Sequence, residues 1–411
     1  MTSDSSNQKP RVLIAGGGIA GLEAMMAIRD HAGERVEITL VAPDPDFVYK
    51  PLIVEEPFSS QPAVQHALGP IAEEFDARFV QQRVTAVLPK ARKVELAEGS
   101  NLEYDKLIIC IGARQRPAFA HAMPLRTDGT LLPIDSMLRE TESSESKVMA
   151  FVIPPGRTWP LPVYELALMA QRRSREIGVQ GVECLIVTPE ESPLIVFGRT
   201  ASDAVSSLLA ARGIKIRTAV RVKEATNSQL LVAPKDERID FGQMVSLPVL
   251  EGPGLAGIPA DEEGFIPIDG HATVRGVEDV YAAGDGTNFP IKHGGIGTEE
   301  ADAAAEHIAA SVGAEIDPQP FRPVIRGKLL TGDDSLHMQH DIAGGGGEGT
   351  ASPDYLWWPP GKVAGRYLSA FLGQRTADDL EPPPHSLDVE VALPDEWHKD
   401  PMALDPLRPM P

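Results

Sequence analysis

The stretch that decides the fold is VLIAGGGIAGLEA at residues 12–24. Its apolar start predicts a buried parallel strand, and the pattern after the glycines predicts a helix. The glycines have the spacing Gly16-x-Gly18-x-x-Gly21, in which the first allows a tight turn, the second lets a diphosphate approach the backbone, and the third lets helix and strand pack closely. Free N–H groups at the start of the helix would favour bound phosphate. The stretch therefore predicts a dinucleotide site.

The composition is that of an acidic globular protein. The chain has 411 residues, enough for two or three domains, of which 42% are hydrophobic and 24% are charged. A formal net charge of −21 argues against nucleic acid as a partner and against simple attraction to anionic lipid. No run of 18 apolar residues is present, so we expect no transmembrane segment. We expect a cytoplasmic protein, for which peripheral membrane contact stays open.

Cysteine use narrows the chemistry further. The two cysteines, Cys110 and Cys184, each lie in an apolar run, where a free cysteine is usually a small buried hydrophobe. They form no close pair in the sequence, so neither a dithiol redox motif nor a thiolate metal site is predicted. We expect no metal in this protein.

A second strand, predicted at residues 36–41, completes a β-α-β unit. In dinucleotide folds an acid at the end of this strand commonly accepts the ribose hydroxyls, but here the position is Ala42. Asp44 could take this role with a small shift, or it could be a plain loop acid. The loop that follows carries Lys50 and Pro51, at an edge of the sheet where ligands bind in such folds.

Two later strands end in turns of small residues. The strand at residues 104–111 leads to Gly112 and Ala113, and the strand at residues 280–283 leads to Gly284 and Asp285. Such turns allow a ligand to come close to the backbone.

A glycine-rich stretch at residues 294–297 then leads into a helix that the sequence predicts from Thr298 to Val312. Thr298 is a suitable N-cap residue, because its side-chain oxygen can accept a hydrogen bond from the first turn. The stretch indicates a place for an anion or an electron-rich ring.

A second α/β unit is predicted after a polar linker at residues 140–146. The loop at residues 154–162 stands where a second glycine-rich motif would be expected, but it contains four prolines and one glycine. Because proline has no N–H group to donate, this loop argues against an NAD(P)H site.

Three stretches together resemble the two-dinucleotide-binding-domain flavoproteins, the pyridine nucleotide–disulfide oxidoreductase superfamily. They are the glycine motif, the strand and turn at residues 107–113, and the strand, acid and helix from residue 280; their order and separation match over residues 10–325. The resemblance implies that the first stretch holds the diphosphate of FAD and that the second passes near the cofactor. It also implies that Asp285 holds the ribitol or a hydroxyl near the phosphates.

The same resemblance implies an α/β fold with two Rossmann-like domains of the FAD/NAD(P)-binding type, the second inserted in the first, and a smaller irregular C-terminal region. The expected ranges are 10–140 and 251–320 for the FAD-binding domain, 147–250 for the second domain, 321–380 for the C-terminal region and 381–411 for a disordered tail.

Within the superfamily the chain is similar to the branch of sulfide:quinone oxidoreductases, flavocytochrome c sulfide dehydrogenase flavoproteins and type II NADH dehydrogenases. The similarity rests on the loop Tyr49-Lys50-Pro51-Leu52, the proline-rich turn at residues 153–162, Arg326-Gly327, and WWPPGK at residues 357–362. The sulfide enzymes use cysteines beside the flavin, and the NADH dehydrogenases need a glycine-rich loop in the second domain. This sequence keeps the flavin-binding stretches and lacks both of those features.

The candidate catalytic residues are Lys50, Lys292 and His293. We expect the reactive ring of FAD to lie between the two α/β units, where a helix N-terminus and a lysine would stabilise the negative charge of reduced flavin. Either lysine could instead be a solvated loop cation. His293 could exchange protons with a substrate or with the flavin, or it could be structural. The candidate cofactor contacts are Gly16, Gly18, Ile19, Ala20, Gly21, Ala42, Asp44, Lys50, Pro51, Val84, Gly112, Ala113, Gly284, Asp285, Gly295 and Ile296.

The leading interpretation is an FAD-dependent oxidoreductase that passes electrons from an unidentified donor to a quinone or another small acceptor, without a cysteine-based sulfide site. One alternative is an NAD(P)H dehydrogenase with an atypical nucleotide loop. Another is a flavin-binding partner protein that has lost catalysis. A homodimer is left open.

Overall fold

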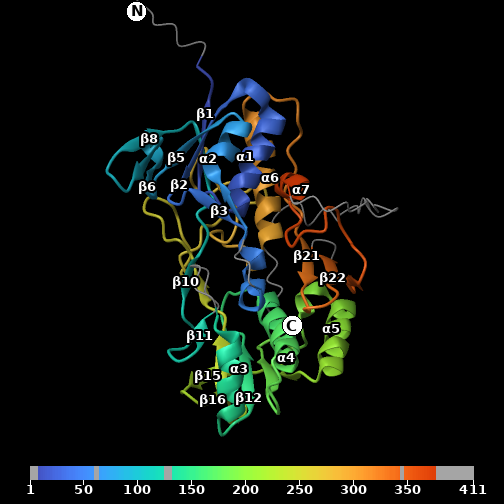
Figure 1. Ribbon diagram of the computed structural model, residues 1–411. Coiled ribbons are helices and arrows are strands. Elements are labelled where there is room, and N and C mark those ends of the chain that lie inside the picture. The colour runs from blue at the N-terminus through green and yellow to red at the C-terminus, as the bar shows by residue number, and fades with distance from the viewer. Residues whose placement is uncertain (1–7, 60–63, 125–131, 343–346, 376–411) are drawn as a thin grey trace, which may run out of the picture.

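A computed structural model describes residues 8–59, 64–124, 132–342 and 347–375 (Figure 1). Within these residues the chain forms two parallel β-sheets with helices packed on them, and five small antiparallel sheets. The strands of the second parallel sheet come between two strands of the first in the sequence, so the second unit is inserted in the first. The predicted α/β fold class is confirmed. The expected tail at residues 381–411 lies outside the described residues, and the residue boundaries of the domains stay a prediction.

The first sheet has the strand order β20-β9-β1-β2-β5, and all of its strands are parallel. Its strands are β1 (Arg11–Ala15), β2 (Glu37–Ala42), β5 (Ala77–Gln81), β9 (Lys106–Ile109) and β20 (Val280–Ala282). Leu13, Ile14 and Ala15 of β1 are at most 2% exposed, because β1 is central in the sheet and helices cover it. Such a continuous apolar run is typical of a strand that is buried on both faces.

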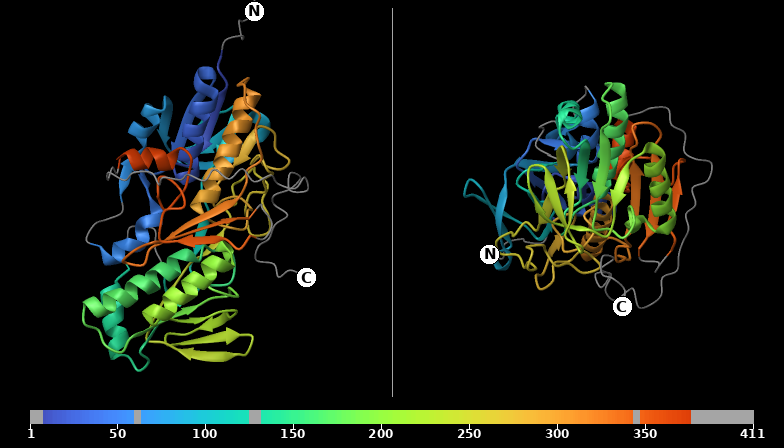
Figure 2. Two further views of the ribbon diagram at one scale, coloured as in Figure 1. Left: turned by 90° about the vertical axis from the view of Figure 1, so that its right-hand side faces the viewer. Right: turned by 90° about the horizontal axis from the view of Figure 1, so that it is seen from below.

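Two long helices of this unit, α1 (Ile19–Ala32) and α6 (Gly294–Ser311), lie side by side (Figures 1 and 2). The sequence predicted that the second of them starts at Thr298, and this is wrong. The helix starts four residues earlier, with His293 as its N-cap, and the Thr298 hydroxyl donates to the carbonyl of Gly295 inside the first turn. A Cβ atom at Gly297 would lie 2.9 Å from Cα of Gly284, so close packing requires this glycine and outweighs its low helix propensity.

The second sheet has the order β11-β18-β12-β13-β14 and is also parallel. Its strands are β11 (Met123–Pro124), β12 (Val148–Val152), β13 (Glu183–Val187), β14 (Lys215–Arg217) and β18 (Gln243–Ser246), and its helices are α3 (Ile134–Ser143), α4 (Leu161–Glu176) and α5 (Arg199–Arg212). The meander of β15 (Arg221–Ala225), β16 (Gln229–Ala233) and β17 (Glu237–Asp240) belongs to the same part of the chain.

The chain passes between the two units twice, and the two passages pair with each other. They are the antiparallel strands β10 (Arg114–Arg116) and β19 (Val249–Glu251) (Figure 1). The remaining elements of the first unit are β3 (Asp46–Val48), β4 (Gln65–Ala67), α2 (Leu68–Glu74), β6 (Val84–Leu88), β7 (Lys93–Leu96) and β8 (Asn101–Glu103), with a 3-10 helix over Lys50–Phe58.

The C-terminal region contacts both units. It contains an antiparallel sheet of three strands, β21 (Val324–Leu329), β22 (Leu336–Asp341) and β23 (Thr350–Ser352). Strand β21 contacts α4 and α6. Its helix α7 (Leu368–Arg375) lies on α1, where the buried carboxylate of Glu23 accepts the N–H groups of Tyr367 and Leu368 at 2.8 and 2.7 Å. This carboxylate satisfies donors at the helix start that have no partner within the helix.

Candidate functional site

A cavity of about 150 Å³ lies at the carboxyl ends of β9 and β20, between the N-termini of α1 and α6. In open parallel sheets this edge is where ligands bind. Eight of the predicted site residues line the cavity: Gly18, Ile19, Ala20, Lys50, Gly112, Gly284, Asp285 and His293. The structure therefore brings together four stretches that are far apart in the sequence.

The three glycines of the first motif have different surroundings. A Cβ atom at Gly16 would lie 2.2 Å from the carbonyl oxygen of Cys110, and one at Gly21 would lie 1.9 Å from the carbonyl oxygen of Gly16. Close packing of strand, turn and helix therefore requires glycine at both positions. A Cβ atom at Gly18 would meet nothing within 4 Å, since this residue faces the cavity. Gly18 is also the N-cap of α1 and provides no side-chain cap, so the first N–H groups of the helix are available to an anion. These residues fit the diphosphate of a dinucleotide.

The other predicted contacts do not line the cavity. Ala42 is buried at the end of β2, where its Cβ would lie 3.0 Å from a Cβ atom placed at Gly17, while Asp44 is exposed. The rest lie in neighbouring elements: Pro51 in the 3-10 helix, Val84 in β6, Ala113 after β9, and Gly295 and Ile296 in the first turn of α6.

Six residues that line the cavity were not among the candidate contacts, although Gly294 and Gly297 lie in the stretch at residues 294–297 that was predicted to face an anion or a ring. The six are Phe47, Val48, Cys110, Ala283, Gly294 and Gly297. Four of them were within or next to stretches already singled out, and the aromatic loop before Lys50 was a usable signal for Phe47 and Val48. Cys110 was assigned to a strand, but β9 ends at Ile109 and Cys110 begins the turn. Its place at the strand end was the signal that could have identified it.

Neither cysteine is a reactive thiol in this structure. Cys110 and Cys184 are both buried and unpaired. Burial raises the pKa of the Cys110 thiol far above its ordinary value and that of Cys184 to about 12. Since the thiolate is the nucleophile, both groups are held in the unreactive form.

His293 is held in one place and one charge state. Its Nδ1 accepts the N–H of Gly295 at 3.2 Å, and its ring lies 4.6 Å from that of Trp159. Burial lowers its pKa to about 3, and the positive charges of Lys362 and Arg326 add to this effect. The imidazole is therefore neutral at ordinary pH, with Nδ1 as an acceptor at the start of α6.

Lys292 is a buried cation next to the cavity and is 3% exposed. Its Nζ donates to the carbonyl of Thr287 at 2.5 Å and lies 4.0 Å from the ring centre of Phe265. Burial lowers its pKa to about 8, although the carboxylates of Asp285 and Glu300 oppose this. Lys292 therefore titrates near neutral pH, which an exposed lysine does not.

Two carboxyl groups accompany this lysine. Glu300 of α6 accepts the N–H of Gly284 at 2.6 Å and the hydroxyl of Thr287 at 2.9 Å, and burial raises its pKa to about 8. Burial also raises the pKa of Asp285, although the charges of Lys292 and Lys50 lower it. Asp285, which lines the cavity, thus lies in a buried group of ionisable side chains with Lys292 and Glu300 that can change its proton content near neutral pH.

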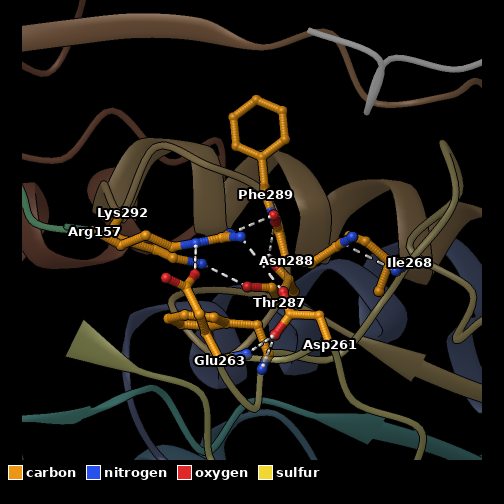
Figure 3. Close-up of polar contacts among 9 residues, drawn as sticks. Arg157, Asp261, Glu263, Ile268, Thr287, Asn288, Phe289 and Lys292 are labelled. Carbon is orange, nitrogen blue, oxygen red and sulfur yellow. Dashed lines mark hydrogen bonds and ion pairs between the residues drawn. The ribbon is translucent and has the colours of Figure 1, made fainter. Parts of the chain in front are cut away.

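The proline-rich loop of the second unit turns towards the first unit. Arg157 extends from this loop, and its guanidinium bonds to Glu263 Oε2 at 2.6 Å, to the carbonyl of Asn288 at 2.8 Å and to Asp261 Oδ2 at 3.4 Å (Figure 3). The same group lies 4.7 Å from the ring centre of Phe265. The Arg157 side chain is thus bonded to the first unit, in a loop that stands where a dinucleotide-binding loop would be expected.

The acid that follows β13 is also engaged. In dinucleotide-binding folds an acid near the end of the second strand accepts ribose hydroxyls. Here Glu190 Oε2 accepts the hydroxyls of Tyr164 at 2.6 Å and Thr188 at 2.9 Å. Burial raises the pKa of Glu190 to about 7. The second unit therefore keeps the topology of a nucleotide-binding domain, while the groups that would hold a nucleotide bond to other parts of the chain.

A buried ion pair connects the second unit to the C-terminal region. Glu165, in the second turn of α4, forms an ion pair with Lys362 and accepts the N–H of Leu330 at 2.9 Å. Both partners of the pair are buried, and Lys362 also donates to the carbonyl of Lys328 at 3.2 Å. Burial raises the pKa of Glu165, although the charge of Lys362 opposes this.

Fold and cavity together define a two-domain dinucleotide-binding protein. The chain belongs to the pyridine nucleotide-disulphide oxidoreductase family, whose model matches residues 10–146 and 164–308. Members of this family are flavin-dependent oxidoreductases that bind FAD. The residues around the cavity fit this cofactor, since a glycine with open space and two helix N-termini meet there.

The chain is similar to a sulfide-quinone reductase and to an NAD(P)H-ubiquinone oxidoreductase. A sulfide-quinone reductase of Aquifex aeolicus is 24% identical over 175 residues, which are 41% of this chain and 40% of that protein. The alternative NAD(P)H-ubiquinone oxidoreductase C1 of Arabidopsis thaliana is 22% identical over 364 residues, 77% of this chain and 69% of the relative. The first match thus covers less than half of that relative.

The solved structure of the sulfide:quinone oxidoreductase from Aquifex aeolicus superposes with a TM-score of 0.75 at 18% identity, covering 84% of this chain and 86% of that one. At this identity the likeness shows the fold. In the part of the chain that the structure describes, no helix has the length and apolar character needed to cross a membrane. Nor do the described residues contain a group of three or more His, Cys, Asp or Glu side chains that could hold a metal ion.

Proposed function

We propose that the protein passes electrons from a donor other than a nicotinamide through FAD to a quinone, without a sulfur-carrying cysteine. The observation that carries this proposal is the engagement of the proline-rich loop: Arg157 bonds to three groups of the first unit. A dinucleotide bound in the second unit would have to displace these contacts or do without the loop. The quinone is supported by the two relatives named above, whose names both contain a quinone acceptor.

Bound FAD would supply the redox chemistry, and the chain's residues would place it. Gly18 and the first turn of α1 would hold the diphosphate, and Asp285 would accept a hydroxyl of the cofactor. The N-terminus of α6 and the charge of Lys292 would favour negative charge on the reduced cofactor. Lys50 lines the same cavity and would add positive charge at its mouth.

His293 is better suited to hold α6 than to exchange protons. Its pKa of about 3 leaves it without a proton to give at neutral pH, and its Nδ1 already accepts the N–H of Gly295. For proton exchange near the cofactor we therefore favour Lys292, whose pKa is about 8. This choice reduces the three candidate catalytic residues to the two lysines.

An anaerobic titration of the FAD-loaded protein with NADH and then NADPH tests the choice of donor. We expect no loss of the visible flavin absorbance with either nucleotide, followed by complete loss with dithionite. Rapid, stoichiometric bleaching by NADH or NADPH would contradict the proposal and favour the second candidate, an NAD(P)H dehydrogenase with an atypical loop. That candidate is supported by the relative from Arabidopsis thaliana, whose name includes NAD(P)H. Flavin that dithionite reduces but no acceptor reoxidises would favour a non-catalytic partner protein.

A further inference from the structure

Two cations from different units share one aromatic ring. The guanidinium carbon of Arg157 lies 4.7 Å from the ring centre of Phe265, and Nζ of Lys292 lies 4.0 Å from the same centre. Both distances are within the range of favourable cation–π contacts. Arg157 comes from the loop before α4, whereas Phe265 and Lys292 belong to the return segment of the first unit (Figure 3). The ring therefore brings a residue of the inserted unit next to the lysine beside the cavity.

The guanidinium of Arg157 has more bonding partners than the ammonium group of Lys292. Two carboxylates, Asp261 and Glu263, and one carbonyl bind the guanidinium, whereas Nζ of Lys292 donates to a single carbonyl. An arginine fork held on several sides keeps its position and its charge. The Arg157 side chain is a quarter exposed, whereas Lys292 is almost completely buried.

Four residues are the main charged influences on the pKa of Lys292. Asp285 and Glu300 attract its ammonium group from the cavity side and from α6, and Asp261 attracts it more weakly. Of these four, Arg157 carries a like charge and lowers the pKa of Lys292. The loop of the second unit thus supplies the opposing charge in an otherwise acidic environment.

We propose that Arg157 is a positioning residue that, by sharing the ring of Phe265 with Lys292, controls whether the lysine next to the cofactor keeps its proton. The loop at residues 154–162 stands where other domains of this fold bind a dinucleotide. In this protein it would instead influence the charge of Lys292 beside FAD. This inference rests on the proposed function, because it takes Lys292 to lie beside the bound flavin.

The direction of the effect follows from the charge of Arg157. Removing the guanidinium removes a like charge that lowers the pKa of Lys292, so the lysine keeps its proton to higher pH. We expect a rise of about one pH unit for the loss of one nearby charge.

The test is the reduction potential of the bound flavin as a function of pH in the FAD-loaded protein. In the wild type we expect the slope of potential against pH to change near pH 8, where Lys292 loses its proton. In R157Q the change of slope moves up by about one pH unit, in R157K it stays near its wild-type place, and in a K292M background R157Q no longer moves it. R157M has a similar length without the charge and makes the same test if R157Q does not fold.

The matched control is Arg116, which pairs with Glu251 at 2.7 Å on the exposed β10–β19 link. R116Q removes a guanidinium–carboxylate pair near the same passage and is expected to leave the change of slope in place. An unshifted change of slope in both R157Q and R157M would overturn the inference, as would a wild type without one. The proposed function would survive either result, because it fails on different observations: bleaching by a nicotinamide nucleotide or absence of bound FAD.

Discussion

Loss of the ion pair between Glu165 and Lys362 should clearly lower the free energy of unfolding. K362M leaves the Glu165 carboxyl in a buried place with only the N–H of Leu330 as a partner. Removing one member of a buried pair costs about 3–5 kcal/mol of unfolding free energy, because the remaining charge is desolvated and unpaired. Burial raises the pKa of Glu165, so the carboxyl can escape part of this cost by taking up a proton at lower pH. The loss should therefore be greater at pH 8 than at pH 5.

Urea unfolding followed by circular dichroism at both pH values measures this loss. The double variant E165L/K362M should recover most of it, because apolar residues of similar volume often replace a buried ion pair at little cost. The control K223Q removes an exposed pair with Asp236 and should leave the midpoint unchanged. A loss under about 1 kcal/mol in K362M at pH 8, or a double variant as unstable as the single one, would refute this reasoning.

Three further predictions concern the cofactor site and the second unit. G21A should fail to bind FAD and should unfold at a lower temperature, because its Cβ would lie 1.9 Å from a carbonyl oxygen. G18A has room for its Cβ and should lose FAD affinity without losing stability. Equal melting temperatures of the two apoproteins would contradict this prediction. The double variant C110S/C184S should keep its flavin and its quinone turnover, and loss of turnover at full flavin content would show a role for a thiol. Glu190 has a pKa raised from 4.5 to about 7, so the folded state binds its proton more tightly and stability falls as pH rises through that range. E190Q should remove at most about 3 kcal/mol of this fall, and an unchanged pH profile of unfolding would contradict the assignment.

The sequence was sufficient for the parts of the site that depend on local geometry. The spacing of the first glycine motif forces a tight turn and close helix packing, and both appear as Cβ positions that the backbone excludes. The predicted start of α6 was wrong. Local propensity favours Thr298 as a cap, but Gly297 packs on Gly284 and the helix begins at Gly294. Tertiary packing outweighed propensity there.

Contacts between distant residues were beyond the reach of sequence reasoning. Arg157 is 104 to 131 positions from its three partners, and Glu165 is 197 positions from Lys362. No periodicity or spacing rule connects residues so far apart, and both pairs depend on how the second unit sits against the rest of the chain. The absence of a glycine-rich loop was visible in the sequence, but what the loop does instead was not.

Reoxidation of the reduced flavin by a quinone tests the central claim most directly. The protein would be purified, its FAD content measured, the flavin reduced with a stoichiometric amount of dithionite without oxygen, and a short-chain water-soluble quinone added. The account predicts one FAD per chain and rapid return of the oxidised flavin spectrum, with one quinone consumed per flavin. A protein that holds no FAD, or a reduced flavin that stays reduced in the presence of the quinone, would contradict it.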